Sequence, residues 1–593
     1  MITKMTKYTF LLLSSDTEIF LREIQETGLL DITRSRKPVD VASARIFREA
    51  EDIRHEIEAI EKCDYSKDAK HEALSAELAA ASAALAEKEH WGDQDAGKLR
   101  ALEQAGYRFH YHAVPVKKFN PAWLEQYAIA VIGQDEKRIR FVRVDHASEG
   151  AHNFQAPEIL LAEEPLAALS AKVETLKQAI ADRKSEMQSR KQDIPSLQQA
   201  YAEKAQELQR YLARSGSETA AEDYISVMTG FAPAEDDARL KDELDKKAIY
   251  YTREPATAAD NPPVKLKNNW FARNFETLTG MYGMPVYDEF DPTPVLAPFF
   301  LLFWSFCMGD AGYGLVLIAL GLLLKKGNFD LLGLKKHWRL IITLGVGTFV
   351  VGLFLGTFFG IGLKEISWIP EGFRKLMLVG KLEAGGSSYD VAMIAAIAIG
   401  IFHICLAMVI KAVGLTKRAG FKEAISTWGW VVLIVGGLTV AGLALTNVLN
   451  AAATKIAVIA VGVLSVLGIF IFNKPGRNPL LNVGAGLWDS YQMATGILGD
   501  VLSYIRLYAL GLAGGMLGWA FNEIGTMLLG SHPTWQWVPF LAIVLLGHGL
   551  NFAMSCLGAF VHPLRLTFVE YFKNSGYEGK GLEYSPLNKE SKL

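Results

Sequence analysis

Hydrophobic and polar positions are distributed differently in the two halves of this 593-residue chain. Up to about Pro292, charged helical stretches alternate with short runs of strand-forming residues. From Pro292 to about Phe572, long apolar segments are separated by brief polar loops, as in membrane-spanning helices. The pattern predicts a hydrophilic N-terminal region of residues 1–291, an α-helical membrane domain of residues 292–573 and a polar tail of residues 574–593.

Small α+β lobes are predicted in the N-terminal region. Residues 7–34 have the pattern of strand, amphipathic helix and strand, and strand-like runs recur at 107–116, 127–144, 223–231 and 247–253. The first residues, MITKMTKYTFLLLSSDTEIF, lack the long apolar core and cleavage pattern of a signal peptide. We therefore expect this region to lie in the cytoplasm.

Two helical segments, at about 41–91 and 164–213, keep a heptad spacing of apolar residues. Spacings of three and four sustained over several heptads predict a coiled coil, and the strands between the segments would let the two arms pair antiparallel. Pro195 is expected to kink the second arm or to end a helix there. The alternative is that these helices pack within a globular domain.

Five apolar segments are each long enough to span a bilayer: 337–363, 391–413, 427–448, 451–472 and 537–572. The block 292–324 is too long for one upright span and is interrupted around Gly309 and Asp310, so it could be one tilted helix or a hairpin. A hairpin keeps the loop KKGNFDLLGLKKHWR, with five Lys and Arg, on the cytoplasmic side. We therefore predict eight membrane helices with both termini in the cytoplasm.

The same topology places other polar segments. The basic stretches 411–422 and 474–477 would lie inside, and the turns 447–452 and 531–535 outside. The segment 364–381 is an exception, because it carries basic residues and would lie outside. The region from Gly484 to Leu529 could span twice; if it crosses once it must be tilted or kinked, and Gly496 and Gly499 are the expected bending points.

Arg506 is the centre of the functional prediction. It has apolar neighbours and no acidic residue three or four positions away, so its compensation must come from another helix or chain. Arg565 lies at a similar distance beyond the turn that joins the last two helices, so both arginines could reach the same depth. The alternative for Arg565 is that its side chain extends to the membrane interface.

Other polar residues on the last two helices could form an ion path, because polar groups at membrane depth are costly. His403, alone on an apolar span, is expected to be structural. The ion-path candidates are Gln492, Asp500, Ser503, Ser555, His562 and Glu570.

The amino-acid composition and the absence of certain motifs argue against several classes of function. A mean hydropathy of +0.16 is high for a soluble protein, and a net charge of −3 gives no basic surface for nucleic acid. The four cysteines are widely spaced, which predicts neither a disulfide nor a metal site. The sequence has no phosphate-binding loop and no nucleophile–base motif, so ATP chemistry would belong to a partner.

Three segments resemble a known family: SYIRLYALGLA around Arg506, FVHPLRLTFVEYF around Arg565 and PFFLLFWSFCMGDAGYG around Asp310. They resemble the membrane stator subunit of V-type and A-type rotary ATPases, called subunit a or subunit I. The lobes, the paired arms, the DYISVMTGFAPAEDD segment and the GKGLEYSPL tail also fit. The resemblance therefore covers nearly the whole chain.

The resemblance implies a non-hydrolytic subunit of the prokaryotic inner (plasma) membrane. ATP-hydrolysing head subunits, a central-stalk adaptor subunit, peripheral stalk subunits, a rotating ring of small membrane subunits and membrane lipid would be its partners. This chain would supply two offset half-channels for H⁺ or Na⁺ and would bind no cofactor. Arg506 and Arg565 would favour the ionised ring carboxylate and block a direct leak.

The sequence departs from the eukaryotic pattern at three positions: Gly514 replaces a histidine, and Gln492 and Ser555 replace acidic residues. The half-channel residues of the family therefore do not transfer directly. Two other functions remain open: a secondary transporter with a regulatory coiled coil, and a membrane anchor for a scaffold. The absence of a repeat within the membrane region argues against the transporter.

Overall fold

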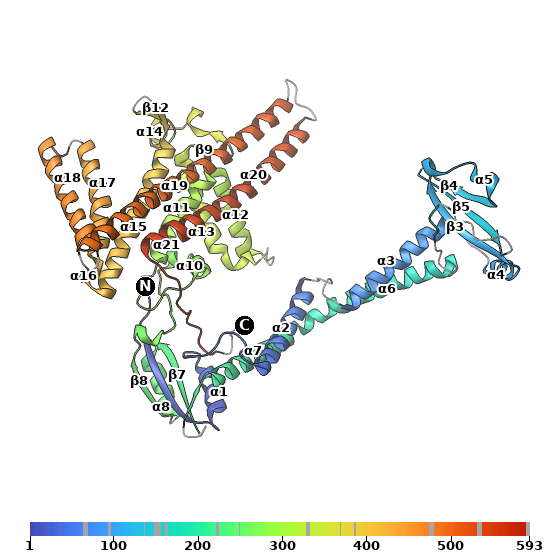
Figure 1. Cartoon of the computed structure of the whole chain (residues 1–593), viewed down its shortest axis with the longest axis horizontal. Helices are drawn as coiled ribbons and strands as arrows, with labels where there is room; N and C mark the ends of the chain where they lie inside the picture. The colour runs from blue at the N-terminus through green and yellow to red at the C-terminus, as the bar shows by residue number, and fades with distance from the viewer. Residues whose placement is uncertain are drawn as a thin grey trace. The chain divides into compact units, whose positions relative to one another are not determined.

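The computed structural model describes residues 1–62, 69–92, 96–135, 137–147, 154, 156–159, 164–220, 224–247, 249–327, 333–367, 369–384, 387–446, 448–473, 479–529 and 536–588. The chain forms two compact units. One contains Met1–Leu12, Leu29–Ile32 and Ile225–Pro586, and the other contains Leu13–Gly28 and Thr33–Tyr224 with the residues from Leu587 onward. Most of the described residues are helical, and the strands form small sheets (Figure 1).

The predicted arms are two antiparallel helix pairs in the second unit. Helix α2 (Val41–Lys62) packs on α7 (Ile194–Ser215), and α3 (Ala69–Glu89) packs on α6 (Leu166–Ser189), as Figure 1 shows. Apolar side chains form the seams, with Ile46 against Leu208 and Leu212, and Ala81 against Val173 and Leu176. The heptad pattern therefore identified both helix pairs.

Ion pairs across the seams show the antiparallel direction. Glu49 bonds Lys204 at 2.9 Å, Glu56 bonds Arg190 at 2.5 Å and Glu77 bonds Lys172 at 3.6 Å. Along the first arm the residue numbers of the acidic partners increase, while those of the basic partners on the second arm decrease. A 3-10 turn (Arg190–Asp193) separates the helices of the second arm, and Pro195 lies in the first turn of α7, where its missing N–H costs nothing.

A small lobe lies between the arm helices in sequence. Its sheet has the order β3-β5-β4, formed by Tyr107–Pro115, Arg138–His146 and Ile129–Gln134, all antiparallel. Phe141 is fully buried among Val114 and Ile139, and this apolar cluster holds the sheet together. The predicted strand runs 107–116 and 127–144 are thus confirmed, the second as a pair of strands. Helices α4 (Ala96–Gln104) and α5 (Trp123–Gln126) and a 3-10 turn (Val116–Lys118) complete the lobe.

The first unit contains a sheet with the order β2-β7-β1-β8. Its strands are Asp31–Ile32, Ile225–Pro233, Met5–Leu13 and Tyr251–Pro255. The expected strands at both ends of residues 7–34 and at 223–231 are present, and α8 (Asp237–Lys246) and a 3-10 turn (Ala258–Asp260) follow β7 and β8. In the second unit, α1 (Thr17–Thr27) packs on α7, where Arg210 Nε lies 3.0 Å from Glu18 Oε1, and a further strand is β6 (Glu218–Ala220).

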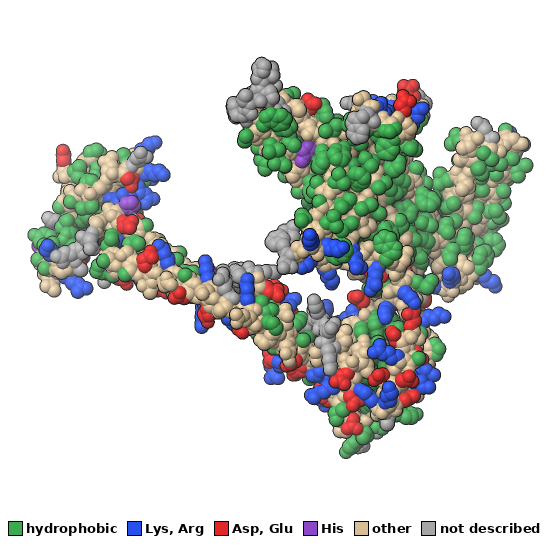
Figure 2. Space-filling model, turned by 180° about the vertical axis from the view of Figure 1, so that it is seen from behind, with side chains coloured by type: hydrophobic (Ala, Val, Ile, Leu, Met, Phe, Trp, Pro, Cys, Tyr) green, Lys and Arg blue, Asp and Glu red, His purple; other side chains and the backbone are tan. Residues whose placement is uncertain are grey.

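Within the described residues, six helices are long and apolar enough to cross a membrane, so this is a multi-pass membrane protein. Hydrophobic side chains cover most of their outer surface in Figure 2. The first three spans are Leu334–Leu355 (which contains α13, Trp338–Leu355), Val391–Ala419 (α15) and Phe421–Leu445 (α16, Phe421–Val431, to α17, Gly437–Leu445). The other three are Ala451–Ile471 (α18, Ala451–Val466, and a π-helical turn), Leu481–Leu528 within α19 (Pro479–Leu529), and Trp537–Ser575 (α20, Trp537–Arg565, to α21, Phe572–Ser575).

The apolar block 292–324 is a helical hairpin and not one long helix. It forms α11 (Thr293–Met308) and α12 (Ala311–Lys326), separated at Gly309, which has a left-handed conformation (φ 63°). Helix α12 runs antiparallel to α13: a Cβ on Gly352 would lie 2.3 Å from Ala311 N, and one on Gly321 would lie 2.5 Å from Ile342 Cγ1. Each helix has only 16 residues, shorter than the six long spans.

One boundary prediction was wrong. Helix α13 ends at Leu355, not near Leu363, because Gly356 adopts a left-handed conformation (φ 71°) and a short β9–β10 hairpin (Thr357–Phe358 and Ile361–Gly362) follows. Helix α19 is one uninterrupted helix through Gly496 and Gly499 and forms a single candidate span, so the expected tilt or bend at these glycines stays a prediction.

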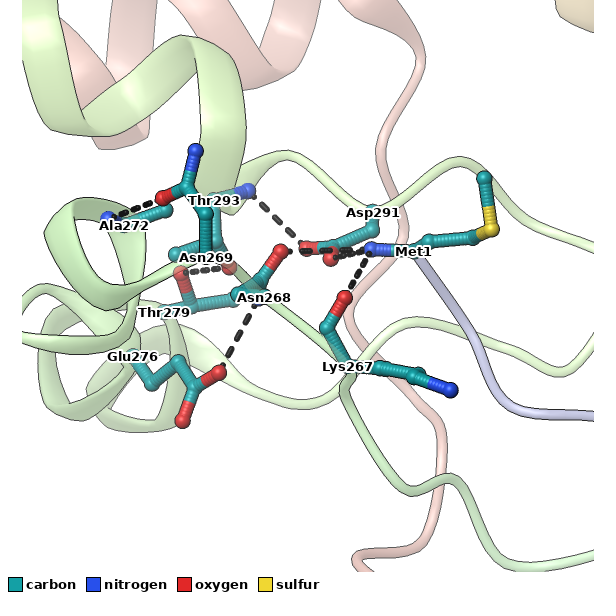
Figure 3. Close-up of polar contacts among 9 residues, drawn as sticks. All are labelled: Met1, Lys267, Asn268, Asn269, Ala272, Glu276, Thr279, Asp291 and Thr293. Carbon is teal, nitrogen blue, oxygen red and sulfur yellow. Dashed lines mark hydrogen bonds and ion pairs between the residues drawn. The ribbon is translucent and has the colours of Figure 1, made fainter. Parts of the chain in front are cut away.

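The region before α11 is held by short polar contacts (Figure 3). Asn269 caps α9 (Trp270–Arg273) by accepting from Ala272 N at 2.8 Å, and α10 (Glu276–Tyr282) follows. Thr293 N donates to Asp291 Oδ1 at 3.0 Å, and the Thr293 hydroxyl lies 2.9 Å from that of Thr279. These contacts fix the start of α11 against α10.

The remaining short elements lie in the loops of the membrane region or within its candidate spans. Several predicted loop features, namely Cys63, Asn447, the segment 474–477 and the turn 531–535, lie outside the described residues. The short elements are 3-10 turns at Leu334–His337 and Leu363–Glu365, α14 (Glu371–Leu376), β11 (Lys381–Ala384), β12 (Ser387–Asp390) and π-helical turns at Val432–Gly436, Leu467–Ile471 and Leu566–Tyr571.

Candidate functional site

The last two long helices, α19 and α20, pack antiparallel along most of their length (Figure 1). Small residues set their register: a Cβ on Gly514 would lie 3.2 Å from Ser555 Oγ, and one on Gly525 would lie 3.0 Å from Val544 Cγ2. Close approach at glycine is typical of packed membrane helices. In this register Arg506 lies opposite Pro563, two residues before Arg565, so both arginines lie at nearly the same level of the helix pair.

Arg506 has no described partner for its charge. Its Nη1 atom is buried and makes no hydrogen bond within the described part of the chain, and no ion pair of Arg506 or Arg565 occurs there either. Cys307 of α11 and His562 of α20 lie within electrostatic range of Arg506. A buried cation in this position calls for an anion, and the described residues of this chain bring none to it.

Arg565 is exposed and is the last residue of α20. It is followed by the π-helical turn Leu566–Tyr571. Wide turns of this kind often occur at functional sites, since the extra residue changes the face that the following side chains present. His562 is half-buried and lies within electrostatic range of both arginines.

A first group of polar side chains, which we name the inner cluster, lies between the middle of α19 and the segment that follows α20, namely the π-helical turn and α21. Its members are Asp500, Ser503, Glu570, Lys573 and Asn574. Asn574 Nδ2 donates to Asp500 Oδ2 at 2.7 Å, and Lys573 Nζ lies 3.5 Å from Asp500 Oδ1. Glu570 is buried (2% exposed) next to Ser503, and its Oε2 atom has no hydrogen-bond partner among the described residues.

A second group, the outer cluster, lies farther along α19 and includes a residue of α12. Its members are Tyr313, Asn522, His548, Asn551 and Ser555. The Tyr313 hydroxyl lies 2.9 Å from His548 Nδ1 and accepts from Asn551 Nδ2 at 2.8 Å. His548 Nε2 lies 3.0 Å from Asn522 Oδ1, and Ser555 Oγ lies 3.4 Å from Asn551 Oδ1. The five side chains form a connected polar chain.

The two clusters lie on opposite sides of Arg506 along the helix pair. On α19 the inner cluster precedes Arg506 and the outer cluster follows it, and on α20 the order is reversed, as the antiparallel register requires. No hydrogen bond joins the two clusters in the described residues. Two polar paths are therefore separated at the level of the arginine.

The predicted candidates divide into those inside and those outside these clusters. The inner cluster includes Asp500, Ser503 and Glu570, and the outer cluster includes Ser555. Gln492 is exposed and lies about two turns before Asp500, outside the inner cluster. The prediction missed Tyr313, Asn522 and Asn574 as members, although a tyrosine or asparagine within an apolar span was a usable signal.

Asp310, in one of the characteristic segments, has a structural role. Its carboxylate is 1% exposed and accepts from the backbone N–H groups of Gly312 and Phe359 at 2.8 Å each and of Gly360 at 2.8 Å. It thereby caps α12 and ties it to the β9–β10 hairpin. In the described residues no cluster of His, Cys, Asp and Glu has the arrangement of a metal site.

Comparison with known proteins finds similarity to one family. A family model described as "V-type ATPase 116kDa subunit family" matches residues 127–354. "A-type ATP synthase subunit I" of Methanocaldococcus jannaschii is 31% identical over 393 residues, covering 62% of this chain and 55% of the relative.

Two other relatives extend this similarity. "A-type ATP synthase subunit I" of Pyrococcus abyssi is 34% identical over 351 residues, with 57% of this chain and 50% of the relative covered. "V-type ATP synthase subunit I" of Borreliella burgdorferi is 29% identical over 385 residues, with 63% and 62% covered. The chain thus spans about half the length of the curated relatives it matches. These matches show that the chain, with its membrane helices, is a homologue of the subunit I proteins of V-type and A-type ATP synthases.

Proposed function

We propose that this chain is the ion-translocating stator subunit of a V/A-type rotary ATPase. The observation that carries the proposal is the unpaired guanidinium of Arg506 between two separate polar clusters. The inner cluster would form the cytoplasmic half-channel, and the outer cluster would form the half-channel open to the other side. Arg506 and Arg565 would lie between them, and the transported ion would be H⁺ or Na⁺.

The missing anion would come from a partner subunit. A buried cation is costly unless it is paired, and the described part of this chain offers Arg506 no carboxylate. Large apolar side chains are exposed beside Arg506, which suits contact with membrane helices of a ring of small subunits. They are Leu498, Leu502, Leu557 and Val561, with exposed fractions of 64%, 56%, 68% and 49%.

This arrangement supports a rotary mechanism. A ring carboxylate that has released its ion on one side would pair with Arg506, pass it, and take up another ion from the second half-channel. The arginine also opposes a direct leak, because a cation moving between the clusters must pass a like charge. Head subunits would carry out ATP hydrolysis or synthesis, and a central-stalk adaptor would link them to the ring.

The remaining features support the attachment of a stator. The antiparallel helix pairs and their lobe would hold peripheral stalk subunits, so that this chain does not turn with the ring. We propose the domain division 1–291, 292–573 and 574–593. The short helices α11 and α12 would add two crossings to the six long spans. Eight crossings put both termini in the cytoplasm at a prokaryotic inner membrane.

ATP-driven ion uptake into vesicles containing the purified complex tests this function. Arg506→Ala should abolish uptake, Arg506→Lys should restore little, and Arg565→Ala should cause a milder loss. The matched control is Arg239→Ala, which removes an exposed arginine of α8. Normal uptake by Arg506→Ala in a fully assembled complex would disprove the mechanism. Ion uptake without ATP-hydrolysing partners would instead support a secondary transporter.

A further inference from the structure

A hollow of about 640 Å³ lies where α9 meets the beginning of α13. Three basic residues line it: Arg273 of α9, Lys336 just before α13, and Arg339 in the first turn of α13. All three are exposed side chains. Trp270 and Trp338 also line the hollow, so it combines positive charge with aromatic surface.

The positive charge of this hollow is largely uncompensated. Arg273, Lys336 and Arg339 form no ion pair within the described residues. Glu276 lies within electrostatic range of Arg273, but it already accepts a hydrogen bond from Asn268 at 3.0 Å (Figure 3). Like charges held around one space favour an anionic ligand.

The ring of Trp338 contacts two nearby cationic side chains. The Lys325 ammonium lies 5.0 Å from the centre of its ring, and the Arg339 guanidinium lies 5.3 Å from it. Both distances are within the range of a cation–π contact. These contacts restrict the two side chains, so less conformational entropy is lost when an anion binds.

The hollow lies at the edge of the membrane region. Residues 334–355 form a candidate membrane span, and its first residues line the hollow. Tryptophan at this level is typical of the membrane–water interface, and Trp270 is 79% exposed. Figure 2 shows blue Lys and Arg side chains along the lower border of the green hydrophobic surface.

Apolar residues also line the hollow. Leu340 and Ile342 of α13 face it together with the hydroxyl-bearing Thr277 and Thr343. A ligand that fits must therefore present an anionic group to the basic residues and hydrocarbon to α13. A phospholipid has both parts, and basic pockets beside membrane helices bind such headgroups.

We propose that this hollow binds the phosphate of an anionic phospholipid. Arg273, Lys336 and Arg339 hold the phosphate, and the acyl chains lie along Leu340 and Ile342. The site is separate from Arg506 and both polar clusters. It anchors α9 and the beginning of α13 at the membrane surface, whatever ion the chain carries.

Native mass spectrometry of the full chain in detergent tests this site, with dioctanoyl phosphatidylglycerol and dioctanoyl phosphatidylcholine as probes. The double variant Lys336→Gln/Arg339→Gln should bind phosphatidylglycerol about 25-fold more weakly, at about fivefold per cation removed. The control Lys417→Gln/Lys422→Gln removes two exposed cations, one in the last turn of α15 and one at the start of α16, and should bind like the wild type. Arg339→Lys keeps the charge and serves as a variant that should fold.

Each other outcome contradicts the proposal in a distinct way. Equal loss in both double variants would mean that the whole surface attracts lipid non-specifically. Equal binding of phosphatidylcholine would remove the requirement for an anionic headgroup. Displacement by millimolar inorganic phosphate would indicate a free-anion site, and protection of Lys336 by a partner subunit instead of lipid would indicate a protein interface.

Discussion

His403 Nδ1 lies 2.9 Å from the hydroxyl oxygen of Tyr504, and both side chains are fully buried between α15 and α19. The His403 ring also stacks on Tyr571, with ring centres 4.6 Å apart and planes 8° from parallel. One histidine therefore contacts the helix that carries Arg506 and the π-helical turn after Arg565. This supports the structural role predicted for His403, since it fixes both functional helices against α15.

Gly400→Ala should disturb this contact. A Cβ at position 400 would lie 2.3 Å from Tyr504 Cγ, so α19 or the Tyr504 ring must move. Overpacking of this kind costs about 1–3 kcal/mol. We expect a lower melting temperature for the full chain in detergent and reduced ATP-driven ion uptake.

Gly414→Ala is the control for this prediction. It lies on the same helix, α15, and a Cβ there would meet no atom within 4 Å. The melting temperature of this variant should stay the same or rise slightly, because alanine favours the helix more than glycine does. Equal behaviour of the two variants would show that the Gly400–Tyr504 contact does not fix α19.

Asp310→Asn should destabilise the α11–α12 hairpin. The buried carboxylate accepts backbone N–H bonds at 2.8 Å from Gly312, Phe359 and Gly360, and an amide would direct its own N–H group at one of these donors. Loss of a charged hydrogen bond in this position costs about 1.5–3 kcal/mol. Thermal unfolding of the full chain should show a lower midpoint.

The same chemical change at an exposed site provides the comparison. Asp242 is exposed on α8, so Asp242→Asn should leave the unfolding midpoint unchanged. If Asp310→Asn also leaves it unchanged, the connection between α12 and the β9–β10 hairpin does not depend on the carboxylate charge.

Local patterns predicted the elements of this fold better than its long-range contacts. The heptad positions around Ile46 and Leu208 identified the helix pairs, because a seam repeats every few residues. The charged loop after Lys325 and the interruption at Gly309 identified the hairpin. Each signal lies within one segment of sequence.

The site was predicted less completely. Arg506 was evident because a lone charge on an apolar helix is conspicuous, but Tyr313 joins Asn551 across more than two hundred residues. Nothing near Tyr313 in the sequence indicates that partner. The expected tilt or bend around Gly496 stays a prediction, because the uninterrupted helix Pro479–Leu529 is compatible with either.

The lobe should lose stability in mild acid because of His112. This side chain is 2% exposed, stacks on Phe141 and places Nδ1 3.0 Å from the carbonyl oxygen of Pro157. Burial lowers its pKa below the ordinary 6.5, with a smaller lowering from Arg143 and an opposing effect of that carbonyl. The folded lobe therefore binds fewer protons than the unfolded chain below pH 6.5, and its stability falls as the pH falls from there toward the lowered pKa.

Hydrogen exchange of β3 and β5 peptides at pH 7.5 and 5.5 checks this effect, after correction for intrinsic exchange rates. Wild type should lose protection at pH 5.5, whereas His112→Gln should show little further loss between the two pH values. His110→Gln changes a less buried histidine on the same strand and should retain the wild-type pH response. A pH response that persists in His112→Gln would assign the effect to another group.

Glu570→Gln should block the inner path while leaving the complex assembled. Glu570 is buried next to Ser503, and its Oε2 atom has no hydrogen-bond partner in the described residues, so it is placed to exchange an ion rather than to hold the fold together. With H⁺ as the transported ion, loss of a proton-transfer group should slow ATP-driven uptake by roughly 100-fold. Uptake into vesicles, with subunit composition checked on the same preparation, measures this.

Glu523→Gln is the matched comparison, because it makes the same change at an exposed position of α19 beyond the outer cluster. It should pump at nearly the wild-type rate. Slow pumping in Glu570→Gln but not in Glu523→Gln would tie transport to the buried carboxylate beside the π-helical turn. Normal pumping in Glu570→Gln would mean that ions reach Arg506 by a route that bypasses the inner cluster, and the contacts of Asp500 with Asn574 and Lys573 would then be structural.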